Sequence, residues 1–171
     1  MAQYMHDAHC FSCQVIAGNV SQPGGVLFEN EYWTVRSRSY PVFIPGYLFI
    51  ILKRHCENIT QLTEEEAGAL GPTIKRTCSA IEHVIGPERI YVASYGEGVK
   101  HIHFHITPRT ASMPAGNGAV FLYHRCRELL YRLGMKSVAY SEADTLQTVS
   151  LLKAHLSGNS SAESASSVEK A

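Results

Sequence analysis

A run of six residues from His101 to Ile106 alternates histidine with an apolar residue at every step. Successive side chains of a β-strand point to opposite faces, so the pattern predicts a strand whose apolar side faces a core and whose three histidines share the other side. Residues two apart on such a face lie about 6–7 Å from one another. The three imidazoles can therefore converge on one small ligand, which makes this strand the candidate site of the chain.

The alternation leaves several interpretations of the three histidines open. They could form a solvent-facing strand surface, a three-histidine zinc site or a low-complexity tract, although the interleaved apolar residues argue against a tract. Nucleophilic catalysis is favoured, because a neutral imidazole with an unperturbed pKa of about 6.5 is a good nucleophile near neutral pH. Attack on phosphorus would form a phosphoramidate and divide one difficult displacement into two easier steps.

Composition and charge limit the kinds of partner that we expect this chain to bind. Apolar residues make up 45% and charged residues 18% of its 171 residues, as in a folded globular protein. Its 15 basic residues balance 15 acidic ones, so it lacks the basic excess of a nucleic-acid-binding protein, whereas a small anionic ligand remains compatible. The longest apolar run, Tyr47–Leu52, is too short to span a bilayer, and the N-terminus lacks a signal-peptide core. We therefore expect no membrane association and a cytoplasmic location.

The order of the predicted elements favours an α+β fold. Strands are expected at Val26–Phe28, Tyr32–Val35, Tyr47–Leu52, Arg89–Tyr95 and His101–Thr107. Helices are expected at 10–17, 63–85, 121–133 and 142–156. Because repeated βαβ units are missing, we predict an antiparallel sheet of about five strands, with one long helix and C-terminal helices. Residues 1–156 would form a single domain, and 157–171 a disordered tail rich in serine and alanine.

The long helix has start and stop signals of its own. Thr63 and Glu66 fit a capping box at the N-terminus, and Gly86 followed by Pro87 predicts the end. Pro72 lies inside the helix, where it offers no N–H and its ring clashes with the preceding turn. We therefore expect the helix to be kinked or divided in two near Pro72.

The segment from His101 to Arg109 resembles the signature of the histidine-triad superfamily, and the similarity in order and spacing extends over Cys10–Arg109. The resemblance implies a nucleotidyl hydrolase or transferase that acts on phosphoramidates, dinucleoside polyphosphates or similar substrates, usually as a homodimer. It assigns to His103 the role of a nucleophile that attacks the α-phosphorus and becomes nucleotidylated. It assigns to His105 the binding of the phosphate or the assistance of the leaving group.

A second motif, Cys10-x-x-Cys13, has the two-residue gap of a zinc knuckle. The spacing alone also fits redox cysteines or unligated ones, although no thioredoxin-like βαβ pattern surrounds it. A zinc-binding branch of the same superfamily resembles this chain at the motif, and it implies a ligand set of Cys10, Cys13, His55 and His101. Two thiolates and two imidazoles would leave no open position, so the Zn²⁺ would be structural. The nearby His6 and His9 are alternative ligands.

The chain departs from the superfamily pattern around the expected phosphate. Glu97 and Gly98 stand where relatives typically have glutamine and then serine or threonine. The backbone N–H of Gly98 could still bind a phosphate. Glu97 would repel it unless the carboxylate is protonated, turned away or paired with Lys100. We expect both residues at the substrate site.

A further departure concerns the ribose and the central strand. Arg38 or Ser39 occupies the place of the carboxylate that normally holds the ribose hydroxyls. Arg36 and Arg38 favour an extra phosphate or an anionic leaving group, with a pair of solvated arginines as the alternative. Tyr47 and Leu52 replace the usual histidine and proline.

The function predicted from these features is cleavage of a nucleotide at its α-phosphate through a nucleotidyl-histidine intermediate, with a structural zinc. One alternative keeps the fold and the zinc but acts on a non-nucleotide phosphate. Another is a non-catalytic nucleotide-binding module. A metal-dependent hydrolase that uses all three triad histidines as ligands is the remaining alternative.

Overall fold

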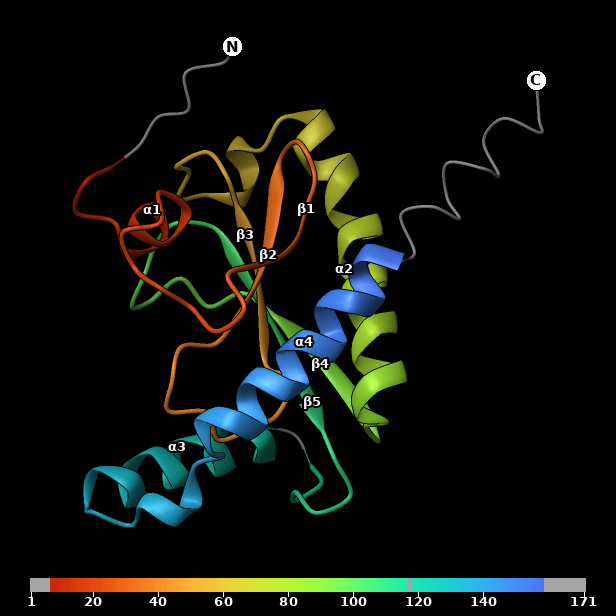
Figure 1. The fold of residues 1–171 in the computed structure, drawn as a ribbon. Coiled ribbons are helices and arrows are strands. Elements are labelled where there is room, and N and C mark those ends of the chain that lie inside the picture. Colours follow the sequence, from red (N-terminus) through yellow and green to blue (C-terminus); the bar gives the residue numbers. More distant parts are fainter. Residues whose placement is uncertain (1–6, 117, 159–171) are drawn as a thin grey trace.

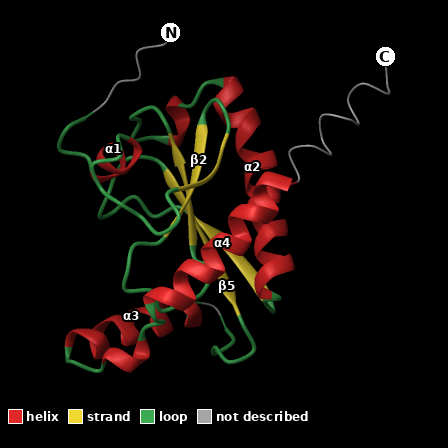
Figure 2. Ribbon diagram, viewed as in Figure 1, coloured by secondary structure: helices red, strands yellow, loops and turns green. Residues whose placement is uncertain are grey.

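The computed structural model describes residues 7–116 and 118–158 and confirms the predicted α+β class (Figures 1 and 2). The elements follow one another as α1 (Phe11–Ile16), β1 (Val26–Glu29), β2 (Trp33–Ser37), β3 (Leu48–Leu52), η1 (Ile59–Gln61), α2 (Glu64–Ile85), β4 (Arg89–Ala93), β5 (His103–Arg109), α3 (Ala119–Arg132), η2 (Lys136–Val138) and α4 (Glu142–Gly158). The five strands form one antiparallel sheet in the order β1-β2-β3-β5-β4. The tail predicted to begin at residue 157 contributes two residues to α4, and 159–171 lie outside the described residues.

One face of the sheet forms the main hydrophobic core, because alternate residues of its central strands are apolar. Helices α2 and α4 lie against each other and cover this face, and α4 also packs on β1 (Figure 1). The fully buried side chains of the sheet include Trp33, Val35, Leu48, Ile50, Leu52 and Ile106. Ile81 of α2 and Leu152 and Leu156 of α4 pack against them. The core therefore occupies one face and leaves the opposite face for a site.

Helix α2 begins and ends where the sequence predicts. The hydroxyl of Thr63 accepts from the N–H of Glu66, whose carboxylate accepts from the N–H of Thr63, so the capping box is present. Gly86 ends the helix in the left-handed conformation, with φ of 61°. The expected division at Pro72 is wrong: the helix runs unbroken from Glu64 to Ile85. Its buried face on the sheet spans both sides of the proline and holds the two halves together.

The opposite face of the sheet carries the histidines. Its strand begins at His103 rather than at His101, so only two of the three histidines belong to β5. His103 pairs with Ile51 and His105 with Phe49 across β3. The predicted core residues of this run, including Ile102, are buried on the other side.

No helix within 7–116 and 118–158 is both long and apolar enough to cross a bilayer.

Candidate active site and metal centre

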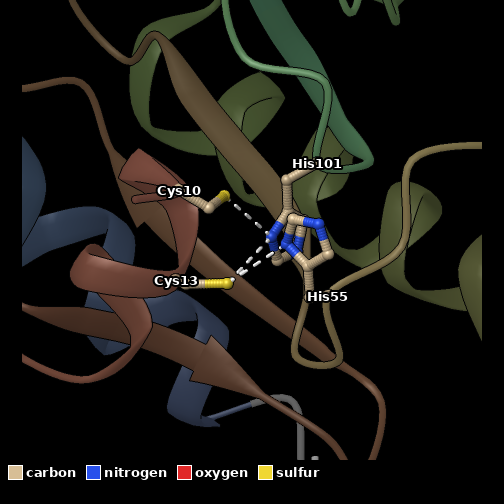
Figure 3. A group of neighbouring side chains, drawn as sticks. All are labelled: Cys10, Cys13, His55 and His101. Carbon is tan, nitrogen blue, oxygen red and sulfur yellow. Dashed lines mark hydrogen bonds between the residues drawn. The ribbon is translucent and has the colours of Figure 1, made fainter. Parts of the chain in front are cut away.

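Two cysteines and two histidines from three segments meet beside α1 (Figure 3). Cys10 precedes the first turn of α1 and Cys13 lies within the helix, whereas His55 follows β3 and His101 precedes β5. Their four ligand atoms all lie within 4.8 Å of one another. The Nδ1 atom of His101 is 3.4 Å from the sulfur of Cys10 and 3.5 Å from that of Cys13, and Nδ1 of His55 is 3.4 Å from the sulfur of Cys13.

The donor set fits a tetrahedral zinc ion. Zinc bonds of about 2.0–2.3 Å place tetrahedral ligand atoms about 3.3–3.8 Å apart, which matches the nitrogen–sulfur separations in this cluster. The carbonyl of Leu52 can only accept, so Nε2–H of His101 donates to it at 2.7 Å and the lone pair of Nδ1 faces the sulfurs. Burial raises the pKa of the Cys13 thiol to about 11, a cost that a divalent cation would offset. These residues are thus suited to zinc.

Of the two predicted alternative ligands, His9 does not join this group. His9 is exposed, and its backbone N–H donates to the carboxylate of Asp7. His6 lies outside the described residues. The four residues implied by the family resemblance are the ones that the structure brings together.

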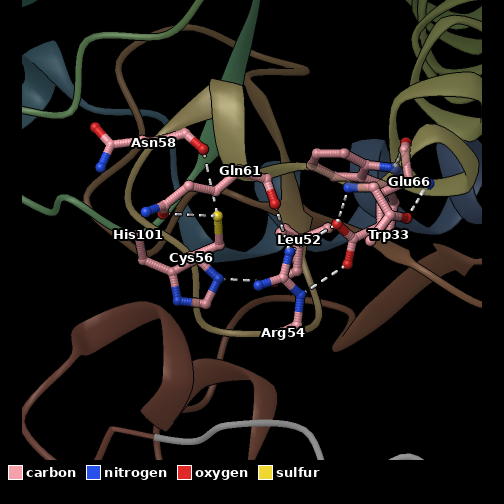
Figure 4. A network of polar contacts seen from close by, with 9 residues as sticks. Trp33, Leu52, Arg54, Cys56, Asn58, Gln61, Glu66 and His101 are labelled. Atoms are coloured by element: carbon pink, nitrogen blue, oxygen red, sulfur yellow. Dashed lines mark hydrogen bonds and ion pairs between the residues drawn. The ribbon is translucent and has the colours of Figure 1, made fainter.

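An ion pair holds the segment that carries His55 (Figure 4). The guanidinium of Arg54 donates to both carboxylate oxygens of Glu66, at 2.9 and 2.8 Å, and to the carbonyl of Gln61. Glu66 is buried, and its carbonyl accepts from the indole N–H of Trp33 at 2.8 Å. The pKa of Glu66 is lowered by the hydrogen bond from Arg54, so the carboxylate is charged and the contact is charge-assisted. The turn after β3 is therefore fixed to the start of α2.

The three triad histidines do not converge on one ligand as the alternation predicted. The ring of His101 is 1% exposed and lies among the cysteines. His103 and His105 instead line a cavity of about 490 Å³ on the sheet face next to α1. His101 lies outside β5, and its side chain turns toward Cys10 and Cys13 instead of sharing the face of His103 and His105.

The hydrogen bond of His103 fixes its tautomer. Its Nδ1 atom lies 2.7 Å from the carbonyl oxygen of His101, and a carbonyl can only accept, so Nδ1 carries the proton. The other nitrogen, Nε2, then holds a free lone pair. Because the ring is half-buried and lines the cavity, Nε2 is a candidate nucleophile.

His105 contacts a tyrosine that comes directly before the neighbouring strand β3. The hydroxyl of Tyr47 lies 2.6 Å from Nδ1 of His105, and the two rings of His103 and His105 are 4.8 Å apart. Burial raises the pKa of Tyr47, so its hydroxyl stays protonated and can donate to Nδ1 of His105; in that arrangement the proton of His105 lies on Nε2. Burial, followed by the charges of His103 and Arg38, lowers the pKa of His105 to about 4. His105 is therefore neutral at physiological pH, and when Nδ1 accepts from Tyr47 its Nε2–H is a hydrogen-bond donor.

The cavity has an apolar wall and a polar loop. Phe11 and Val15 of α1 face Phe49 and Ile51 of β3 across it. The loop between β4 and β5 supplies its polar edge, including the predicted substrate residues. These loop residues are Gly96, Glu97, Gly98 and Val99.

The predicted phosphate loop lines the same cavity as His103 and His105. Glu97 and Gly98 are both exposed at the cavity, so the backbone of Gly98 is open to a ligand. Glu97 forms no ion pair with Lys100 within the described part of the chain, which excludes one of the predicted arrangements. Because Glu97 faces solvent, its charge is screened. The catalytic and binding roles of these residues and of His103 and His105 stay predictions.

Several residues near the site escaped prediction. Gln22 is 7% exposed and lines the cavity beside Phe11, with a side-chain oxygen that no described residue contacts. It belongs to a loop without periodicity, so no sequence signal marks it. His124 of α3 is also buried and packs edge-on against Tyr47. Its only signal is a spacing of four from Val120, another buried residue of α3.

Comparison with known proteins agrees with this geometry. The family model described as the HIT domain matches residues 19–112, more than half of the chain. A protein of *Bacillus subtilis* named protein hit is 29% identical over 126 residues, which cover 70% of this chain and 84% of that protein. The adenosine 5'-monophosphoramidase hnt1 of *Schizosaccharomyces pombe* is 28% identical over 108 residues, 58% of this chain and 74% of that protein.

Solved structures show the same fold. A zinc-bound histidine triad family protein from *Mycobacterium smegmatis* superposes with a TM-score of 0.64 at 19% identity, over 90% of this chain and 97% of the other. A HIT-like protein from *Bartonella henselae* gives a TM-score of 0.63 at 14% identity, over 88% and 98% of the two chains. The match of the family model, the sheet order and the histidine strand agree: this chain belongs to the HIT domain (histidine triad) family.

Proposed function

We propose that this protein is a nucleotidyl hydrolase or transferase that cleaves a nucleoside phosphoramidate or dinucleoside polyphosphate at the α-phosphate. The observation that carries the proposal is the bond from Nδ1–H of His103 to the carbonyl of His101, which leaves Nε2 as a free nucleophile at a cavity. Family membership supports it, and so does the phosphoramidase named among the relatives.

The reaction takes two displacements at phosphorus. The lone pair of His103 Nε2 attacks the α-phosphorus, the bond from phosphorus to the leaving atom breaks, and the leaving atom takes a proton from solvent. Water then attacks the nucleotidyl-histidine, the phosphorus–nitrogen bond breaks, and the water proton passes to solvent. An acceptor other than water would give transfer instead of hydrolysis.

His105 and Gly98 have binding roles in this proposal. A neutral His105 with a pKa of about 4 is too weak a base to stay protonated near neutral pH, so it donates a hydrogen bond to a phosphate oxygen instead of a proton. The exposed N–H of Gly98 is a second donor for the same oxygens. Glu97 lies next to Gly98 at the edge of the cavity, where its exposed carboxylate would face the leaving group or solvent.

A structural zinc ion on Cys10, Cys13, His55 and His101 is part of the proposal. The ion would hold α1, a wall of the cavity, against the start of β5. It would act on His103 only through position, because four protein ligands leave no site for substrate on the metal.

We also propose a cytoplasmic homodimer. Strand β4 is an edge of the sheet, and its Tyr91 and Val92 are 38% and 42% exposed. An uncovered edge strand with exposed apolar side chains is suited to pairing with a second copy of the chain.

Release of AMP from adenosine 5'-phosphoramidate tests the activity. We expect His103→Ala to lower kcat by about 10⁴-fold or more, because removal of a covalent nucleophile removes the chemical pathway. His83→Ala is the matched control, since His83 is an exposed histidine of α2 on the other side of the sheet. A His103→Ala enzyme within tenfold of wild type would refute the assignment.

The exposed Glu97 at the cavity favours a second candidate, a protein of this fold that has lost or changed its activity. A measurement of AMP binding beside the activity assay distinguishes these forms. Wild-type protein that binds AMP without turnover would be a nucleotide-binding module. Wild-type protein that ignores AMP would act on a non-nucleotide phosphate.

A further inference from the structure

A second cavity of about 350 Å³ lies between β4 and α3. It meets the cavity that His103 and His105 line, here called the catalytic cavity, at His105. Both cavities are also lined by Tyr95, Phe121 and Arg125. The catalytic cavity extends along β5 toward His103, whereas the second extends in the other direction, toward Thr107. A substrate bound at the two histidines can therefore continue into it.

Arg38 lines this second cavity without a carboxylate partner. It follows β2, its backbone N–H donates to the carbonyl of Tyr47 at 3.1 Å, and its guanidinium lies over the Tyr47 ring, 5.5 Å from the centroid. Arg38 is half-buried, its Nε is buried, and no described residue accepts from Nε or forms an ion pair with the guanidinium. A fixed, partly desolvated arginine without an acceptor is a strong anion-binding group.

The charges around the cavity do not neutralise Arg38. Among the described residues that line it, Glu128 is the one carboxylate. Glu128 already accepts from two other arginines, Arg125 at 3.0 Å and Arg132 at 2.8 Å. The cavity therefore has an excess of positive charge.

The histidines beside Arg38 also indicate an anion-binding site. His124 is 8% exposed, lines the cavity, and has an Nε2 atom without a partner among the described residues. The positive charge of Arg38 lies near enough to disfavour protonation of both His124 and His105. An anion beside Arg38 would relieve this repulsion.

We infer that Arg38 binds a second phosphate group of the substrate, in addition to the α-phosphate held at His103 and His105. The inference rests on the proposed function for the location of the α-phosphate. The second phosphate has two possible sources: the polyphosphate chain on the leaving side, or a phosphate on the ribose. The bidentate fork of arginine suits either one.

Arginine at this place also changes which substrates are favoured. A simple phosphoramidate offers no second phosphate and leaves Arg38 unpaired. A substrate with a phosphate at Arg38 gains a charge-assisted contact in a partly desolvated cavity. The chain would therefore prefer the more highly phosphorylated nucleotide.

Binding to the full-length, zinc-loaded protein tests the inference without turnover. Isothermal calorimetry would compare AMP with ATP, which extends the chain, and with adenosine 3',5'-bisphosphate, which adds a ribose phosphate. We expect one of the two to bind about 10–100-fold more tightly than AMP. A gain with ATP identifies the leaving side, and a gain with the bisphosphate identifies the ribose.

Three variants test whether Arg38 causes the gain in affinity for the nucleotide with the second phosphate. Arg38→Met keeps the apolar stem and should remove most of the gain, whereas Arg38→Lys should keep part of it. Lys75→Met, which removes an exposed charge from α2, should keep all of it. If circular dichroism shows that Arg38→Met is unfolded, the test is a smaller gain in affinity in Arg38→Lys than in the wild-type protein.

Equal dissociation constants for all three nucleotides in the wild-type protein would overturn the inference. A gain that survives undiminished in both Arg38 variants would also overturn it. Failure to cleave adenosine phosphoramidate would instead count against the proposed function, because the binding comparison needs no cleavage.

Discussion

His101 connects the proposed metal centre to the proposed nucleophile through different atoms of one residue. Its Nδ1 faces the cysteine sulfurs, its Nε2–H donates to Leu52, and its carbonyl accepts from His103. Fixing the ring at two nitrogens also fixes the backbone of the residue. The tautomer of His103 therefore depends on a residue whose own position would be set by the metal.

Buried neutral histidines make a pH-dependent contribution to stability. Burial and then the charge of Arg38 lower the pKa of His124 to about 4, with Glu128 acting in the opposite direction and Arg125 in the same one. The unfolded chain has an ordinary histidine pKa of about 6.5. Between these values the unfolded state binds a proton that the folded state does not, so stability falls as pH decreases from about 6.5 to 4.

We predict that His124→Phe reduces this loss of stability. Phenylalanine keeps a ring against Phe43 and Tyr47 and cannot titrate. Urea unfolding at several pH values between 6.5 and 4 gives the free energy of unfolding as a function of pH. The slope of this plot should be smaller in His124→Phe than in the wild-type protein, by at most about 1.4 kcal/mol per pH unit. His83→Phe controls for an exposed histidine. Identical slopes for wild type and His124→Phe would contradict the burial argument.

At the scale of elements, helix α1 is too short to be stable alone. It has six residues and no side-chain hydrogen bond at its N-cap, and isolated helices of this length do not form in water. Val15 buries its side chain against the sheet, but Phe11 is half-exposed. The proposed metal ligation is therefore a major attachment of α1 to the domain.

We predict that Cys13→Ser abolishes zinc binding and lowers the free energy of unfolding by about 2–5 kcal/mol. Elemental analysis should find one zinc per wild-type chain and almost none in the variant. Cys126→Ser is the control, because Cys126 is an exposed cysteine of α3 and should change neither quantity. Full zinc occupancy in Cys13→Ser would exclude this ligand set.

Elements with local signals could be predicted from the sequence. The capping box at Thr63 and the glycine at Gly86 act within one turn, so both ends of α2 were predictable. The predicted division of α2 and the predicted start of β5 were wrong, in places where distant contacts outweigh local preference. Helix α2 continues through Pro72 because the sheet holds its buried face, and β5 begins after His101 because the ring of that residue turns to the cysteines.

The site was predictable only in part, for the same reason. Spacing and family resemblance placed Cys10, Cys13, His55 and His101 together, and the structure agrees. The contact between Tyr47 and His105 joins residues 58 apart, and no sequence period indicates it. The cavity under α3 depends on how that helix packs against the sheet, which its own amphipathic pattern does not specify.

At the scale of the whole molecule, the two edges of the sheet differ. Helix α4 packs on the edge strand β1, whereas no described strand pairs with the outer edge of β4. Exposed edges are usually protected or paired, and β4 presents the exposed side chains of Tyr91 and Val92 next to the single charge of Arg89. This asymmetry supports the proposed dimer through β4.

We predict that light scattering after size exclusion gives twice the mass of one chain at micromolar concentration. Val92→Lys should shift the equilibrium toward monomer, because a charge on an edge strand opposes pairing. Leu151→Lys replaces a similarly exposed apolar residue of α4 and should leave the dimer intact. A wild-type monomer, or a dimer unaffected by Val92→Lys, would contradict this arrangement.

In the proposed reaction, Nε2 of His103 becomes covalently nucleotidylated. Its most direct test is the intact mass of zinc-loaded protein that has been incubated with adenosine 5'-phosphoramidate and quenched rapidly in mild base. We predict one added adenylyl group in the wild-type protein and in His83→Ala, and none in His103→Ala. An adduct that persists in His103→Ala would show that another residue is the nucleophile. Hydrolysis of the substrate by wild-type protein under single-turnover conditions, with no adduct at any time, would show that the reaction has no covalent intermediate.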